Sequence, residues 1–261
     1  MRLRAPGYLF LTLNVWLCLT AVLMVVVTAR SLSVPASAVG VGLLLPPLLT
    51  YVVYVEDRRR VRAEDDRNQP DRTRLVRRYG RQLLATELAA FVGYQSLLVA
   101  LVRTGPRAGV GAFLLGQVPF IVLAAYDRLK RYPPADSLSV ACTWAFVVVF
   151  AVFVSADVAV SADVVAVFCA WVLIVFAGVE SRNVPDADGD TSADRQTLAG
   201  RLGRRNTTVL EILLKGSGLL VFWSRAGAFV AGLVVVYLLA LRAFRALTVR
   251  AMVRDRPDAP V

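Results

Sequence analysis

Eight apolar stretches, each about long enough to cross a lipid bilayer, constrain this chain more than any other feature of its sequence. A helix needs roughly 20 mostly apolar residues to cross the hydrocarbon core. A spanning segment must also satisfy its own backbone hydrogen bonds, which favours helices. The sequence therefore predicts an all-α integral membrane protein with about eight transmembrane helices. These are expected at residues 8–29, 39–55, 83–102, 108–125, 137–155, 160–179, 207–223 and 227–247.

The composition supports a lipid environment and excludes several classes of protein. Hydrophobic residues make up 57% of the chain, whereas ordinary soluble domains have about 45–50%, and this excludes a disordered chain. The net charge is +11, but charged residues are only 19%, so we expect no nucleic-acid partner. The absence of histidine excludes imidazole ligands and bases. The three cysteines lack C-x-x-C spacing and are expected to be small buried residues.

Basic residues are gathered on one predicted side of the membrane. If the N-terminus is cytoplasmic, 25 of the 30 Lys and Arg residues lie in cytoplasmic segments. The positive-inside rule then predicts a multi-pass cell-membrane protein with both termini in the cytoplasm. The first stretch has 22 residues, too many for a cleaved signal peptide, so we expect it to remain as a span. The same topology places three polar loops (56–82, 126–136 and 180–206) and a short tail (248–261) in the cytoplasm.

The loop 180–206, called here the second acidic loop, has four aspartates within residues 186–194. If the sixth span continues into it as a helix, Asp186 and Asp190 lie about 5–6 Å apart on one face. Such a pair suits Mg²⁺, which prefers one or two carboxylates plus phosphate oxygens. A solvated turn and a cap for the seventh span are the alternatives. A calcium EF-hand is excluded, because Thr191 and Thr197 stand where that loop needs Gly and Glu.

The loop 56–82, the first acidic loop, mixes acidic and basic residues. Asp57, Val61 and Asp65 are spaced to share one helical face, and Pro70 is expected to stop a helix. The alternative is a solvated helix whose basic residues bind anionic lipid head groups. The two acidic loops lie four spans apart, which suggests two related four-helix halves. Their acidic clusters would then face one cavity and hold a pyrophosphate through Mg²⁺.

The loop 126–136, the basic loop, contains the sequence Tyr-Asp-Arg-Leu-Lys-Arg-Tyr-Pro from Tyr126. Its cations, Lys130 among them, could neutralise phosphate oxygens that a metal leaves uncovered. The alternative is an ordinary membrane anchor with interfacial tyrosines.

The three loops together have a recognisable pattern. The second acidic loop carries Asp186, Gly189, Asp190, Thr197, Leu198, Leu202 and Gly203 at the spacing D-x-x-x-D followed by T-L-x-x-x-L-G. The basic loop fits Y-x-x-x-K-R, and the first acidic loop fits the end of N-D-x-x-D-x-x-x-D-x-x-N-x-P-x-R through Asp65, Asn68, Pro70 and Arg72. This pattern resembles the UbiA superfamily of membrane-embedded prenyltransferases. Asn183, Arg58 and Val61 depart from it, because they stand at aspartate positions, and Asp57 stands at the leading Asn.

The resemblance implies one UbiA-like transmembrane domain over residues 1–261, a bundle of two pseudo-equivalent four-helix halves. It implies Mg²⁺-dependent transfer of a prenyl group from an allylic diphosphate to an aromatic or other lipophilic acceptor in the membrane. The alternative is a non-catalytic UbiA-fold protein that binds lipid or acts as a scaffold. The implied catalytic residues are Asp65, Lys130, Asp186 and Asp190; the diphosphate ligands are Asn68, Arg72, Tyr126, Lys130, Arg131 and Asn183; the metal ligands are Asp57, Asp65, Asp186 and Asp190.

Three other classes fit the sequence less well. A transporter would need polar sites at mid-membrane depth, and the main charges there are Glu211 and Lys215. Their four-residue spacing predicts an internal ion pair. A retinal protein linked through Lys215 would need an aspartate in the third span, which is absent. A phospholipid alcohol phosphotransferase would need a D-G-x-x-A-R motif, which is also absent.

Overall fold

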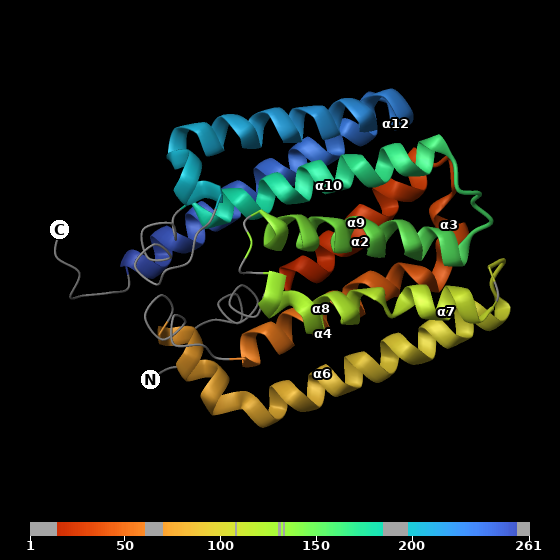
Figure 1. Cartoon of the computed structure of the whole chain (residues 1–261), viewed down its shortest axis with the longest axis horizontal. Coiled ribbons are helices and arrows are strands. Elements are labelled where there is room, and N and C mark those ends of the chain that lie inside the picture. Colours follow the sequence, from red (N-terminus) through yellow and green to blue (C-terminus); the bar gives the residue numbers. More distant parts are fainter. Residues whose placement is uncertain are drawn as a thin grey trace.

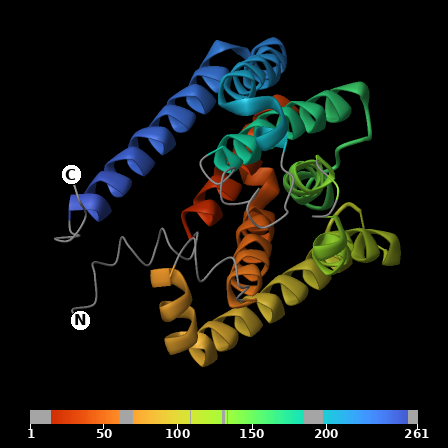
Figure 2. The ribbon, with the colours of Figure 1, turned by 60° about the vertical axis from the view of Figure 1, so that its left-hand side comes forward.

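The computed structural model describes residues 15–60, 70–107, 109–129, 132, 134–184 and 198–254, and its regular elements over these residues are all helices (Figures 1 and 2). They form a single bundle, in which α9 and α10 lie side by side (Figure 1) and α6 and the C-terminal part of α12 run obliquely to α9 (Figure 2). The elements are α2 (Trp16–Ser31), α3 (Ala36–Val39), the 3₁₀ helix η1 (Gly40–Leu44), α4 (Leu45–Arg59), α6 (Pro70–Thr104), α7 (Val110–Gly116), α8 (Val118–Leu129), α9 (Ala135–Ser155), α10 (Ala162–Asn183) and α12 (Leu198–Arg254).

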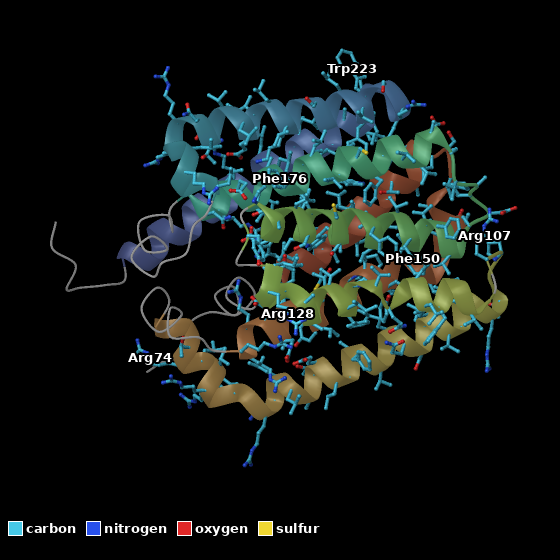
Figure 3. The ribbon with its side chains drawn as sticks, in the orientation of Figure 1. Arg74, Arg107, Arg128, Phe150, Phe176 and Trp223 are labelled. Carbon is cyan, nitrogen blue, oxygen red and sulfur yellow. The ribbon has the colours of Figure 1, made fainter. Side chains whose placement is uncertain are left out.

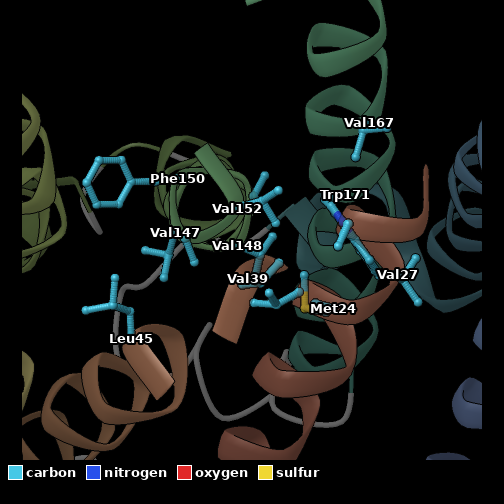
Figure 4. Packing of buried hydrophobic residues seen from close by; sticks show 14 of the residues in the cluster. Met24, Val27, Val39, Leu45, Val147, Val148, Phe150, Val152, Val167 and Trp171 are labelled. Carbon is cyan, nitrogen blue, oxygen red and sulfur yellow. The ribbon is translucent and has the colours of Figure 1, made fainter. Parts of the chain in front are cut away.

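The core is built around α9, which packs against α2, α8 and α10. Its buried residues meet Met24, Val27 and Val39 from the N-terminal part of the chain (Figure 4). The packing is close, because a Cβ at Gly218 of α12 would lie 2.8 Å from the carbonyl oxygen of Ala170 in α10. Trp171 of α10 joins two further helices. Its ring lies 4.7 Å from that of Phe222 in α12, and its Nε1 donates to Thr28 Oγ1 in α2 at 2.8 Å.

The hydropathy of the helices confirms the prediction of an all-α, multi-pass membrane protein. Within the described residues, five helical stretches are long and apolar enough to cross a membrane, and two shorter ones are apolar. The exact number of eight crossings and the two four-helix halves remain predictions. The five stretches are Ala36–Arg59, Thr73–Thr104, Ala135–Ser155, Ala162–Asn183 and Gly200–Ala243; the shorter two are Trp16–Ser31 and Val110–Tyr126.

Two glycines interrupt α12, and one of them reverses its direction. Gly203 has φ 75° and Gly227 has φ 80° and ψ 174°, conformations that residues with a Cβ avoid. The two legs on either side of Gly227 run in opposite directions (Figure 1). The predicted seventh and eighth spans, 207–223 and 227–247, correspond to these two legs. On the first leg, the expected ion pair between Lys215 Nζ and Glu211 Oε1 is present, and both side chains are about one-fifth exposed.

The predicted fourth span is broken at Gln117, between α7 and α8. Phe120 N donates to Gln117 O at 3.0 Å, which leaves the Gly116 carbonyl outside the regular helical ladder. Tyr94 Oη donates to that carbonyl at 2.7 Å. The side-chain amides of Gln95 and Gln117 also donate to each other, at 2.9 and 3.1 Å. Side chains of α6 thus satisfy the polar groups at this break, as a membrane interior requires.

Several local predictions in the loops and at the cysteines are wrong. α4 ends at Arg59, and Arg60 has ψ 70°; Val61 and Asp65, which were predicted to share a helical face with Asp57, lie outside the described residues. Pro70 begins α6, where its fixed φ and missing N–H are tolerated. Residues 70–82 and 198–206, predicted as loop, are therefore helical. The three cysteines are free, but none is buried as predicted: Cys18 and Cys142 are half-buried and Cys169 is exposed.

Candidate active site

The helix ends that border the three predicted loops meet at one end of the bundle, called here the motif end (on the left in Figure 1). In Figure 3, Arg74 and Arg128 lie at this end, whereas Arg107 lies at the opposite one. The fold therefore brings together segments that are far apart in the sequence. The helix ends are those of α4 at Arg59, α8 at Leu129 and α10 at Asn183, and the starts of α6 at Pro70, α9 at Ala135 and α12 at Leu198.

Four of the predicted site residues fall within the described part of the chain. Asp57 lies in the last turn of α4, Tyr126 near the end of α8, and Asn183 at the end of α10; all three are half-buried. Arg72 lies in the first turn of α6. Among the described residues, no group of three acidic or cysteine side chains could hold a metal ion. The remaining six, Asp65, Asn68, Lys130, Arg131, Asp186 and Asp190, lie outside the described residues.

An ion-pair network holds the end of α4 against α6. Glu56 accepts from Arg60 Nε at 2.7 Å and from an Arg59 guanidinium nitrogen at 3.1 Å. The same nitrogen of Arg59 lies 2.7 Å from Glu87 in α6. Val55 of α4 also packs with Val76 and Leu83 of α6. An apolar contact and an ionic contact therefore both hold α4 against α6. The network sets the position of Asp57, which lies between Glu56 and the two arginines in the sequence.

Three buried donors at the motif end have no hydrogen-bond partner among the described residues. They are Arg58 Nε on α4, Thr73 Oγ1 on α6 and Ser137 Oγ on α9. Arg58 follows Asp57, and Thr73 follows Arg72. A buried donor left unpaired costs about 1–3 kcal/mol, and an anion that accepts a hydrogen bond from such a donor removes that cost. The donor set at this end therefore suits an anionic ligand such as a diphosphate.

Two buried acids at the motif end were given no role by sequence reasoning. Asp136 is 8% exposed, and its carboxylate accepts from the backbone N–H of Ser137 at 2.7 Å. Glu180 is 2% exposed and lies one turn before Asn183 on α10. The sequence could have identified both residues as candidates, because each is an acidic residue at the edge of an apolar stretch. Glu180 lies beside the second acidic loop, and Asp136 lies beside the basic loop.

An aromatic pair lies between α4 and α9, just inside the motif end. Trp144 Nε1 donates to Tyr54 Oη at 3.2 Å, and the two ring centroids are 6.2 Å apart. Tyr54 lies one turn before Asp57. Trp144 lies eight residues after Asp136, which at 1.5 Å per residue is about 12 Å along α9. The sequence alone did not identify these residues as a pair, because their helices are distant in the sequence.

The fold and the motif end together define a multi-pass helical membrane protein in which the helix ends that border the three motif segments lie at one end of the bundle. The sequence profile of the UbiA prenyltransferase family matches residues 62–260, and the chain belongs to that family. The chain is also similar to a protein of Oryza sativa subsp. japonica described as probable homogentisate phytyltransferase 2, chloroplastic, with 33% identity over 124 residues. This match covers 45% of the chain and 30% of the rice protein. No solved structure is significantly similar.

Proposed function

We infer that the protein transfers a prenyl group from an allylic diphosphate to an aromatic or other lipophilic acceptor within the membrane. The observation that carries this inference is the meeting, at one polar end of a membrane bundle, of the helix ends that border all three family motifs. Membership of the UbiA family supports the class of reaction. The name of the rice relative supports an aromatic acceptor, because homogentisate is an aromatic acid.

The proposed reaction is a substitution at the allylic carbon. The bond between that carbon and the diphosphate oxygen breaks, and inorganic diphosphate leaves with the electron pair. An electron-rich carbon of the acceptor ring then forms the new bond, and the ring loses a proton. No nucleophilic side chain of the protein is required, so the lack of histidine presents no difficulty. The protein must hold the diphosphate, stabilise the leaving charge and exclude water.

The residues are assigned to these tasks from the family motifs. Bound Mg²⁺ would offset the negative charge of the leaving diphosphate. Arg58, Thr73 and Ser137 add three buried donors at the same end, which supports an anion there. The proposed metal ligands are Asp57, Asp65, Asp186 and Asp190, and the proposed diphosphate ligands are Asn68, Arg72, Tyr126, Lys130, Arg131 and Asn183.

The aromatic pair is suited to the cation that the reaction creates. Tyr54 and Trp144 lie close below the end of α4 that carries Asp57, the depth at which an allylic carbon would sit beneath its diphosphate. An aromatic face stabilises a cation by up to about 2 kcal/mol in a desolvated site. The hydrogen bond from Trp144 to Tyr54 fixes the indole, so its face is held in place before the cation forms.

The proposal can be tested with the purified protein, Mg²⁺, labelled geranylgeranyl diphosphate and homogentisate. We expect diphosphate release and a labelled, prenylated product, both abolished by EDTA. Asp186→Ala and Asp190→Ala should each abolish turnover, whereas Asp188→Ala, in the same loop but off the motif, should retain it. Turnover that survives in either of the first two variants would remove the metal-site assignment.

The alternative is a non-catalytic member of the family. It is favoured by Arg58 and Val61, which stand where the first motif normally has aspartates. This alternative predicts no Mg²⁺-dependent binding of geranylgeranyl diphosphate by the wild-type protein. It also predicts that a deletion strain loses no prenylated lipid or quinone. The disappearance of one such compound from the strain would decide for catalysis and identify the product.

A further inference from the structure

A basic groove lies where the end of α4 meets the bent N-terminal part of α6. The bend is at Tyr79, which has φ −112° and ψ 18°, and the bent N-terminal part of α6 is plain in Figure 2. The groove has a volume of about 580 Å³. It is lined by Arg59 from α4 and by Val76, Arg77, Arg78, Gly80, Arg81, Gln82 and Leu84 from α6.

The charge of the groove calls for an anionic occupant. Of its four arginines, Arg59 is held by Glu56 and Glu87. Over the described residues, neither Arg78 nor Arg81 takes part in a salt bridge, and Arg78 lies 5.5 Å from the ring centroid of Tyr79. Both guanidinium groups belong to exposed residues. Arginine binds phosphate through two parallel N–H donors. Several arginine side chains of the groove can therefore donate hydrogen bonds to one phosphate group.

The groove lies at the depth of lipid head groups. Arg81 and Arg103 are 22 residues apart on α6, which at 1.5 Å per residue is roughly 33 Å, close to the ~30 Å of the hydrocarbon core. Between these two arginines the outer face of α6 is apolar and exposed, with Leu84 38%, Leu88 54% and Val92 60% exposed. The basic groove therefore begins where the lipid-facing surface of the helix ends.

We propose that this groove binds the phosphate of an anionic phospholipid from the surrounding bilayer. Arg77, Arg78 and Arg81 contact the phosphate, and the first acyl carbons lie against Leu84. Leu84, which lines the groove, continues the exposed lipid-facing side of α6 and offers an apolar contact for an acyl chain. A free phosphate has no apolar part that could make this contact. The inference is independent of the proposed enzymatic activity, because Arg77, Arg78 and Arg81 are not among the proposed metal or diphosphate ligands.

The test compares thermal unfolding of the purified full-length protein in phosphatidylcholine and in phosphatidylglycerol nanodiscs. At about 1 kcal/mol for each arginine near an anionic surface, we expect phosphatidylglycerol to raise the Tm by roughly 5–10 °C. The triple variant Arg77→Gln, Arg78→Gln, Arg81→Gln should lose this shift and keep its Tm in phosphatidylcholine. Arg103→Gln, at the other end of α6, should keep the shift.

Further measurements distinguish a phospholipid from inorganic phosphate or a prenyl diphosphate as the ligand of the groove. In phosphatidylcholine discs, inorganic phosphate and geranylgeranyl diphosphate should give no shift that depends on the three arginines; a shift that does would overturn the lipid assignment. A full phosphatidylglycerol shift in the triple variant would also overturn it. If the triple variant does not fold, Arg81→Gln alone should lose about one-third of the shift. A phosphatidylglycerol adduct in native mass spectra that depends on the three arginines would support the proposal.

Discussion

At the scale of single residues, Arg59 holds more of the motif end together than its neighbours in the sequence do. One guanidinium nitrogen bridges Glu56 on its own helix and Glu87 on α6. The Glu87 side chain is only 11% exposed, so its carboxylate depends on this partner. A charge of that kind is costly to leave unpaired, whereas an exposed pair contributes little.

Arg59→Ala should therefore lower the free energy of unfolding by about 2 kcal/mol. The matched control is Arg60→Ala, because Arg60 also pairs with Glu56 but its side chain is 41% exposed; it should cost less than ~1 kcal/mol. Thermal unfolding of both variants in the same detergent measures the difference. Equal losses of stability in the two variants would show that the contact between Arg59 and Glu87 contributes nothing to the free energy of unfolding.

Trp144 provides a second prediction at this scale, and it depends on the proposed reaction. Trp144→Leu removes the aromatic face and should lower kcat about 30-fold, which corresponds to ~2 kcal/mol of cation stabilisation. The KM for the prenyl diphosphate should change little, because the cation exists only in the transition state. Trp144→Phe should retain most of kcat. Equal losses in the two variants would point to packing as the role of this side chain.

At the scale of elements, the reversal of α12 depends on one glycine. Gly227 has φ 80° and ψ 174°, a region that is essentially restricted to glycine and costs other residues about 1–3 kcal/mol. An added Cβ at Gly227 would meet no atom within 4 Å, and the same holds for Gly232 in the following leg. The two glycines therefore differ in backbone conformation and not in available space.

Gly227→Ala should lower the free energy of unfolding by about 1–3 kcal/mol through backbone strain alone. Gly232→Ala, at a helical position, should be neutral or should stabilise the protein by up to ~1 kcal/mol. Denaturant unfolding of both variants in detergent measures the two changes. A Gly227→Ala variant as stable as the wild type would mean that the chain does not turn there by this conformation.

The elements also show which parts of the fold could be predicted from the sequence. Hydropathy located the spanning stretches, because apolar length is a local property. The turn at Gly227 lies between the predicted seventh and eighth spans, whereas the break at Gln117 interrupts a stretch that was predicted as one span. The bend at Tyr79 and the pairing of Arg59 with Glu87 could not be predicted, because both depend on how α4 and α6 pack. The predicted helical face from Asp57 to Asp65 extends beyond Arg60, where α4 has ended, into residues that the structure does not describe.

The candidate site likewise contains some residues that could be assigned from the sequence and others that could not. The motif positions, Asp186 and Asp190 among them, could be assigned because their spacing resembles a family pattern. The supporting groups could not be assigned, since Trp144 and Tyr54 come from helices 90 residues apart. The donors Arg58, Thr73 and Ser137 are notable only because they are buried without a partner in the part of the chain that the structure describes, and burial is not visible in a single sequence.

At the scale of the whole molecule, the motif end determines the side of the membrane on which the chemistry would occur. α9 connects the two ends of the bundle, and its 21 residues extend about 32 Å, enough to cross the hydrocarbon core. Tyr132 precedes α9 at the motif end, and Val160 follows it at the opposite end. Tyr132 is 67% exposed and Val160 is 76% exposed, so both positions are accessible to reagents.

Single-cysteine variants at these two positions test the predicted orientation. In a background with Cys18, Cys142 and Cys169 replaced by serine, Tyr132→Cys should react with a membrane-impermeant maleimide only in inside-out vesicles. Val160→Cys should react only in intact cells. The physical reason is the excess of arginine around the motif end, which the positive-inside rule retains in the cytoplasm. The opposite pattern would reverse the orientation and place the diphosphate chemistry outside. Reaction of both variants from one side would show that α9 does not cross the bilayer.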